Sequence, residues 1–221
     1  GRSYSSFATA EYFSTDRLVG VRTGKGEAKA GEPVSVEYVV VNPNRQEVAG
    51  VPVKIVFTRR QNKLIREKSA GSAYLFKYVP VDEQVGECMG MSATVPQKCV
   101  FTPDKSGLYK VAASVNGGVA SRLSFYVQGA DFVPWAGAEN RLKIVPDKNE
   151  YAAGDAISLT VENPVPGARA LVTVERYGVL ESFVRTLEKS VEKIEIPVKP
   201  DFFPGVYVSV AAFSPRVDAP T

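Results

Sequence analysis

Alternation of apolar with polar residues recurs along this chain, and no other pattern limits the possible folds as strongly. Between residues 53 and 58, for example, Val53, Ile55 and Phe57 fall on one face. An Asn-Gly-Gly turn signal at 116–118 separates two further segments of this kind. Nothing in residues 1–130 sustains a helical period over the roughly 10–12 residues that a helix needs. The chain is therefore predicted to be all-β.

The second half continues the pattern. Residues 179–193 have some helical character, but Val184, Thr186 and Val191 favour a strand there. Gly, Pro or Asn occurs between the segments at intervals of roughly 8–15 residues, which is typical of a β-sandwich. The expected strands lie at 33–41, 53–58, 108–115, 119–127, 142–145, 157–161, 170–175, 182–186, 191–196 and 205–213.

The two halves also resemble each other. Residues 30–36 and 153–159 share the order small residue, Gly, acid, any residue, aliphatic, Ser, aliphatic. Residues 106–113 and 204–212 share a Gly-aliphatic-Tyr step near the end of each half. That step resembles the tyrosine corner of immunoglobulin-like sandwiches, in which the hydroxyl bonds back to the backbone. We expect two tandem antiparallel sandwiches of the immunoglobulin or fibronectin type III kind.

The copies differ in length. The separation between Gly31 and Gly107 exceeds that between Gly154 and Gly205 by about 25 residues. The expected organisation is an N-terminal extension or strand from a preceding region (1–16), a first sandwich (17–128), a linker (129–140) and a second sandwich (141–217). The additional length of the first sandwich is assigned to a cysteine-bearing insertion at about 80–103.

The linker contains the one tryptophan of the chain, Trp135, in a setting of Gly, Ala and Pro. Trp135, with Phe132, is predicted to form the contact between the two sandwiches, where its large apolar area would limit hinge motion. Stacking on a ligand is the alternative role for Trp135.

Cys88 and Cys99 are the two cysteines of the chain. Their spacing is too wide for a Cys-x-x-Cys redox motif, and two thiolates alone do not make a structural zinc site. A disulfide is the simplest use, and it would place the chain in an oxidising compartment such as a periplasm. Two separate thiols are the alternative.

Composition argues against an enzyme. The 221 residues include no histidine, which excludes Ser-His-Asp and Cys-His catalytic centres and histidine-containing zinc sites. No Gly-x-Ser-x-Gly motif or phosphate-binding glycine loop is present. No run approaches the ~18 apolar residues of a membrane span. We expect no catalytic residue, no cofactor, no metal site and no direct membrane insertion.

Two charged clusters could suggest binding sites. The basic run 59–63, followed by Arg66 and Lys68, fits either a nucleic-acid or anionic-lipid patch or a solvated hairpin. The hairpin is favoured, and no nucleic-acid partner is expected, because no RNA-binding signature accompanies the run. Asp147, Glu150 and Asp155 lie near one turn, but their spacing matches no EF-hand, so they are interpreted as ordinary turn acids.

A family resemblance emerges from the second half. Residues 142–151 (LKIVPDKNEY), 153–155 (AGD) and 163–176 (NPVPGARALVTVER) are similar to the segment of bacterial alpha-2-macroglobulins that leads into the bait region. Residues 194–198 and 205–210 continue the match. The first half is similar to the preceding macroglobulin domain through the turn at 27–32 and its strand order.

The resemblance implies a fragment of a broad-range protease inhibitor that is periplasmic and tethered to the inner membrane. In this family a protease cuts the bait and is trapped when the surrounding domains rearrange. Many members carry a Cys-x-Glu-Gln thioester, whereas here Glu83 and Gln84 precede Cys88 in the wrong order. Arg216 is the candidate residue of the segment that would lead into the bait. Implied partners are proteases and, beyond them, a cell-wall synthesis protein or another envelope protein.

Two other functions share the same fold class. Tandem immunoglobulin-like binding modules of a surface adhesin or cell-envelope protein are the main alternative, followed by a non-catalytic accessory part of a larger envelope enzyme. Fold alone does not decide among them.

Overall fold

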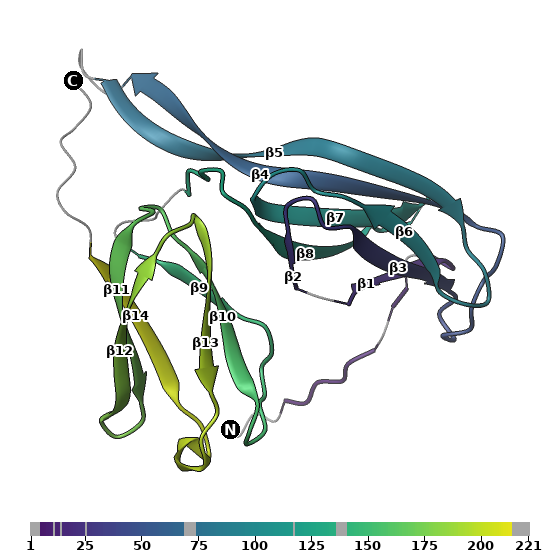
Figure 1. Ribbon diagram of the computed structural model, residues 1–221. Helices are drawn as coiled ribbons and strands as arrows, with labels where there is room; N and C mark the ends of the chain where they lie inside the picture. The colour runs from purple at the N-terminus through teal and green to yellow at the C-terminus, as the bar shows by residue number, and fades with distance from the viewer. Residues whose placement is uncertain are drawn as a thin grey trace.

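The structure is a computed structural model that describes residues 5–10, 12–13, 15–24, 26–68, 74–116, 118–135 and 141–213. Apart from one short 3₁₀ helix, every regular element within these ranges is a strand, which confirms the predicted all-β class. The strands form two groups with separate cores, β1–β8 and β9–β14 (Figure 1). Within the described ranges, no helix has the length and apolar character that a membrane span requires.

The first group consists of two facing sheets. A three-stranded sheet has the order β1-β3-β6, and a five-stranded sheet has the order β2-β8-β7-β4-β5. All pairings are antiparallel except that of β2 with β8. The strands are β1 (Leu18–Thr23), β2 (Glu27–Lys29), β3 (Val34–Val41), β4 (Pro52–Lys68), β5 (Tyr74–Met91), β6 (Gln97–Phe101), β7 (Gly107–Val115) and β8 (Ser121–Gln128).

The period of two in the sequence builds the core of the first sandwich. Side chains alternate between the faces of a strand, so every second residue of β3 and of the first half of β4 points inward. Val36 and Val40 from β3 meet Ile55 and Phe57 from β4 in one apolar cluster, and all four are at most 1% exposed. The Phe57 ring stacks on Phe101 of β6, with centroids 4.4 Å apart.

The second group is a smaller sandwich. Its sheets have the orders β13-β10-β9 and β12-β11-β14, and all pairings are antiparallel. Val161, Val172, Val174, Leu187 and Ile194 are fully buried between the two sheets. The elements are β9 (Lys143–Pro146), β10 (Ala156–Glu162), β11 (Ala168–Glu175), β12 (Val179–Leu187), β13 (Val191–Pro197), the 3₁₀ helix η1 (Pro200–Phe202) and β14 (Tyr207–Phe213).

The internal repeat predicted at 30–36 and 153–159 has a structural counterpart in two similar turns. Gly31 and Gly154 both adopt a left-handed backbone, with φ of 85° and 91°, which glycine tolerates without strain. The acid that follows each glycine caps its turn. Glu32 accepts a hydrogen bond from the N–H of Lys29, and Asp155 accepts one from the N–H of Ala152, both at 3.1 Å.

The tyrosine corner forms in one copy. The hydroxyl of Tyr109 donates a hydrogen bond of 2.8 Å to the carbonyl of Lys105, and the tyrosine is fully buried. Tyr207, the matching residue of the second sandwich, is 78% exposed. The sequence echo predicted this corner in both sandwiches; it is confirmed in the first, whereas the tyrosine of the second lies exposed.

The additional length of the first sandwich lies elsewhere than in the expected insertion at 80–103. Within that range, β5 pairs with β4 as far as Met91, and β6 pairs with β3. Both strands belong to the sheets, because Cys99 and other apolar positions there complete the core. Strand β7 pairs with β4 only from Val53 to Arg60. Beyond Arg60, β4 and β5 continue as a two-stranded ribbon (Figure 1).

Candidate functional site

The junction between the two sandwiches is built around Trp135, which is 6% exposed. Its indole Nε1 donates a hydrogen bond of 2.5 Å to the carbonyl of Ser190, which precedes β13. The hydroxyl of Ser190 in turn accepts the N–H of Val133 at 3.0 Å. Phe132 is 59% exposed and is not part of the buried cluster. The cluster combines residues from β7, β8, the linker and β13: Leu108, Tyr126, Val133, Trp135 and Val191, with Val145 of β9 packed against it.

A polar network adjoins this apolar cluster. The hydroxyl of Tyr126 donates to Glu162 Oε1 at 2.8 Å, and Lys143 Nζ donates to the same oxygen at 2.8 Å and to the phenol oxygen at 3.1 Å. Burial, followed by the hydrogen bond to the Glu162 carboxylate, raises the pKa of Tyr126 to about 12. Burial opposes the charge of Lys143, but its hydrogen bonds to Glu162 and Tyr126 leave its pKa raised. The phenol and the ammonium therefore both keep their protons at neutral pH.

An ion pair also crosses between the sandwiches. Lys193 of β13 lies 2.6 Å from Glu27 of β2 and 3.1 Å from Glu195. The hydrogen bond to Glu27, followed by that to Glu195, raises the pKa of Lys193. The junction thus joins the sandwiches through an apolar cluster, the hydrogen bonds of Tyr126 and the Lys193–Glu27 ion pair.

Two residues of the basic run, Arg59 and Asn62, contact the linker. Arg59 is 8% exposed, its Nε donates to the carbonyl of Ser106 at 2.9 Å, and its guanidinium lies 3.4 Å from Asp131. The side chain of Asn62 donates to the carbonyl of Pro134 at 2.6 Å. Burial raises the pKa of Asp131, but the backbone and hydroxyl contacts with Ser106 and the charge of Arg59 outweigh it, so the net shift is downward.

Two further residues of the run, Arg60 and Gln61, contact acids on the neighbouring strand β5. Arg60 and Lys110 both pair with Asp82, at 3.1 and 2.6 Å, and Gln61 donates to Glu83. Hydrogen bonds to Lys110 and Arg60 overcome the effect of burial and lower the pKa of Asp82. This supports the hairpin interpretation, since Arg60 is compensated by Asp82 across the β4–β5 pairing. The side chains of Arg66 and Lys68 lie outside the described part.

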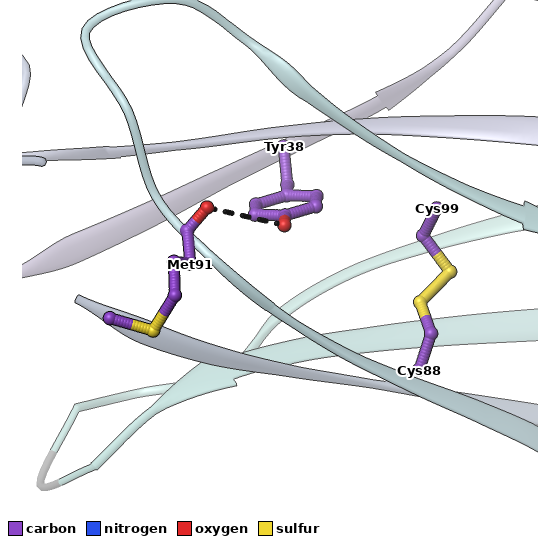
Figure 2. The surroundings of a disulfide bond; sticks show 4 residues. All are labelled: Tyr38, Cys88, Met91 and Cys99. Atoms are coloured by element: carbon purple, nitrogen blue, oxygen red, sulfur yellow. Dashed lines mark hydrogen bonds between the residues drawn. A yellow bond between two sulfur atoms is a disulfide. The ribbon is translucent and has the colours of Figure 1, made fainter. Parts of the chain in front are cut away.

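Cys88 and Cys99 form the predicted disulfide, with Cα atoms 6.5 Å apart (Figure 2). The bond connects β5 of the five-stranded sheet to β6 of the three-stranded sheet. Nearby, the hydroxyl of Tyr38 reaches the carbonyl of Met91 at 3.5 Å (Figure 2). The two contacts link the sheets along the edge at which β5 and β6 lie.

Asp147 and Asp155 both make hydrogen bonds or ion pairs with residues in or next to their own turn. Asp147 accepts hydrogen bonds from the hydroxyl of Tyr151 at 2.5 Å and from the N–H of Ser158 at 3.3 Å. Asp155 pairs with Lys148 at 3.6 Å. Within the described ranges, no group of three or more metal-binding acids and cysteines comes together. Arg216, the candidate residue on the approach to the bait, lies outside the described residues.

Comparison with known proteins identifies the second sandwich most directly. Residues 142–219 match the family model of the alpha-2-macroglobulin bait region domain, a span that includes β9 to β14. An alpha-2-macroglobulin homolog of Nostoc sp. is 22% identical over 211 residues, which cover 92% of this chain and 11% of the relative. The second sandwich is thus similar to the bait region domain of alpha-2-macroglobulins.

Further comparisons name the same family. An alpha-2-macroglobulin of Pasteurella multocida is 23% identical over 203 residues, covering 89% of this chain and 11% of the relative. The native E. coli alpha-2-macroglobulin structure is 17% identical, with a TM-score of 0.46 over 90% of this chain and 15% of that one. The chain thus spans about a tenth of the length of the curated alpha-2-macroglobulins that it matches.

Proposed function

We propose that this chain is a non-catalytic structural part of a bacterial alpha-2-macroglobulin-like inhibitor that traps a broad range of proteases after they cut its bait. One observation carries the proposal: the bait region domain family matches residues 142–219, and thus every strand of the second sandwich. In this proposal the bait begins after β14, with Arg216 on the approach to it.

The junction geometry fits a supporting role. A trap that changes shape after cleavage needs rigid parts that move as units, and a buried apolar cluster with flanking ion pairs favours one arrangement of two domains. The Trp135 cluster and the contacts of Lys143 and Lys193 supply these features. In the proposed mechanism the hydrolytic chemistry belongs to the captured protease, and this part of the chain holds the bait in place.

The proposed location is the periplasm, with the full-length protein tethered to the inner membrane. The Cys88–Cys99 disulfide supports an oxidising compartment, since such bonds persist there and are rare in the cytosol. Proteases are the proposed partners of the full-length protein. A cell-wall synthesis protein or another envelope protein is a further proposed partner, on the family resemblance alone.

The test incubates the full-length protein with several proteases of unrelated specificity and maps the earliest cuts by mass spectrometry. We expect the first cuts C-terminal to Phe213, followed by a change in hydrodynamic radius and loss of protease activity on large substrates but not on small ones. Early cuts scattered over both sandwiches, or early cuts without a change of radius, would contradict the trap.

Two controls sharpen this experiment. The same proteases with their nucleophile replaced by alanine should cause no change of radius, because the trigger is cleavage. Arg216→Gln should slow cutting by a trypsin-like protease at that position and leave cutting by an elastase-like protease unchanged. Residues 1–221 alone should inhibit none of them.

A further inference from the structure

Strands β4 and β5 run on past the other strands of their sheet as a two-stranded arm (Figure 1). β7 pairs with β4 only as far as Arg60, whereas β5 pairs with β4 as far as Lys68, which lies opposite Tyr74. At about 3.3 Å per residue, the part of β4 from Asn62 to Lys68 extends the arm by roughly 20 Å. A two-stranded hairpin by itself is at best marginally stable in water. An arm of this length therefore gains stability when one of its faces meets another surface.

The arm, residues 61–68 and 74–81, carries the whole net charge of the chain. It contains one acid, Glu67, and four cations, Lys63, Arg66, Lys68 and Lys77. The net charge of all 221 residues is +3, which equals the excess of cations in the arm, so the rest of the sequence is balanced. The arm is thus a strongly cationic projection from a molecule that is otherwise neutral in sum.

The strand register divides the arm into two faces. Residues directly opposite each other in an antiparallel pair belong to the same face, and successive pairs alternate between the faces. One face, called the aromatic face below, consists of the pairs Leu64–Tyr78, Arg66–Phe76 and Lys68–Tyr74. It combines three aromatic residues with two cations and includes no acid. Glu67 belongs to the opposite face, as does Ile65.

This combination of residues matches the surface of an anionic bilayer. Aromatic residues favour the headgroup level of a membrane, and an anionic leaflet attracts Lys and Arg. Tyr78 is 49% exposed, so its ring has room to meet such a surface. The Cys88–Cys99 disulfide supports an oxidising compartment, which favours a bilayer over an intracellular nucleic acid as the occupant.

We propose that the aromatic face of the arm docks on the surface of an anionic phospholipid bilayer, with its rings at headgroup level and its cations attracted by the lipid phosphates. The contact is peripheral, since the arm lies on the bilayer and does not span it. The inference rests on the proposed location in the periplasm. Arg59 and Asn62, at the base of the arm, contact the linker, so a docked arm also orients the junction of the two sandwiches relative to the membrane.

Vesicle flotation of the 221-residue chain tests the proposal without any protease. We expect binding to vesicles of phosphatidylglycerol mixed with phosphatidylcholine to be at least about tenfold stronger than binding to phosphatidylcholine alone. High salt should remove most of the difference, because it screens exposed charges.

Two double variants compare cations at different places. A Lys or Arg near an anionic surface strengthens binding roughly fivefold, so Arg66→Gln with Lys68→Gln should weaken binding at least about tenfold. The matched control is Lys98→Gln with Lys189→Gln, which removes the same charge at exposed positions outside the arm and should leave binding nearly unchanged.

Two single variants compare the faces. Tyr78→Ser should weaken binding to anionic vesicles several-fold, because a ring is lost from the headgroup level. Ile65→Ser is the control on the opposite face, where the side chain is 39% exposed, and should have little effect. Circular dichroism of all four variants confirms that they are folded before binding is compared.

Equal binding to the two kinds of vesicle, equal losses in the two double variants, or equal losses in the two single variants would each overturn the proposal. Tighter binding to duplex DNA than to anionic vesicles would also overturn it. Vesicle binding by a protein whose full-length form traps no protease would refute the proposed function and keep this site. Trapping by the full-length protein without vesicle binding would do the reverse.

Discussion

The indole nitrogen of Trp135 lies 2.5 Å from the carbonyl oxygen of Ser190, and this hydrogen bond ties the linker to the second sandwich. Tryptophan combines a large apolar surface with one donor, so it contributes most where the ring is covered and the N–H is satisfied. Both conditions hold at this junction.

Trp135→Ala should loosen the junction. Removing a buried aromatic ring typically costs about 3 kcal/mol, and here the loss falls on the contact between the sandwiches. We expect the thermal transitions of the two sandwiches to separate and the radius of gyration from X-ray scattering to rise. Phe132→Ala is the matched control, because that ring is 59% exposed and should leave both measurements unchanged. Identical behaviour of the two variants would refute the role of Trp135.

Removal of the Cys88–Cys99 bond should lower the free energy of unfolding of the first sandwich. A bond closing a loop of this sequence separation, 11 residues, contributes about 2–3 kcal/mol in the chain-entropy treatment. Denaturant titration with and without reductant measures the loss. The Cys88→Ala/Cys99→Ala double variant is the control, since its titration curves with and without reductant should coincide. An unchanged midpoint in reductant would mean that the sheets hold together without the bond.

Tyr109→Phe should destabilise the first sandwich by about 1–2 kcal/mol, because the carbonyl of Lys105 loses the donor that the tyrosine supplies. Tyr207→Phe offers a matched comparison in the second sandwich. Its side chain is 78% exposed, so we expect no measurable change. Chemical denaturation of the two variants in parallel compares them directly. Equal effects would argue against a specific corner in the first sandwich.

Alkaline pH should weaken the junction through Tyr126. Its pKa rises from the ordinary 10.0 to about 12 in the folded protein, so its contribution is complete below about pH 10 and is lost as the pH rises towards 12. Lys143 acts in the same direction, since its folded-state pKa is also raised. The exposure of Trp135, followed by fluorescence quenching with iodide, should increase over this range. Tyr126→Phe should flatten that increase, and an equally steep one would contradict the assignment.

Gly86→Ala should destabilise the first sandwich, because a Cβ at this position would lie 2.7 Å from the Phe101 ring, which itself stacks on Phe57. Overpacking of this kind typically costs about 1–3 kcal/mol. Gly178→Ala is the control, since a Cβ there meets no atom within 4 Å. The thermal midpoints of the two variants test the difference. A neutral Gly86→Ala would show that Phe101 can move aside.

The strand pattern of this protein could be predicted from local sequence with good success where alternation was clear. Segments such as 108–115 and 191–196 correspond closely to β7 and β13. Residues 74–91 were not predicted, although they form one of the longest strands, β5. Two glycines and a dense set of charges weaken its alternation, and its strand conformation is set by pairing with β4 along its length.

The junction was predictable only in part. A lone tryptophan in a Gly- and Pro-containing linker indicates a buried anchor, and Trp135 is buried. The neighbouring Phe132 has a similar apolar character and lies exposed. The Tyr126–Lys143–Glu162 network carries no sequence signal, because its members lie on three strands of two sandwiches and meet only after both have folded.

What the sequence by itself determined is the all-β class, the twofold repeat and the two turn glycines, since these depend on local periodicity and backbone freedom. The tertiary structure alone decided where the additional length lies, which aromatic residue joins the sandwiches and whether the two cysteines pair. Those features depend on register and on contacts between residues far apart in the chain. Short-range patterns do not encode such contacts.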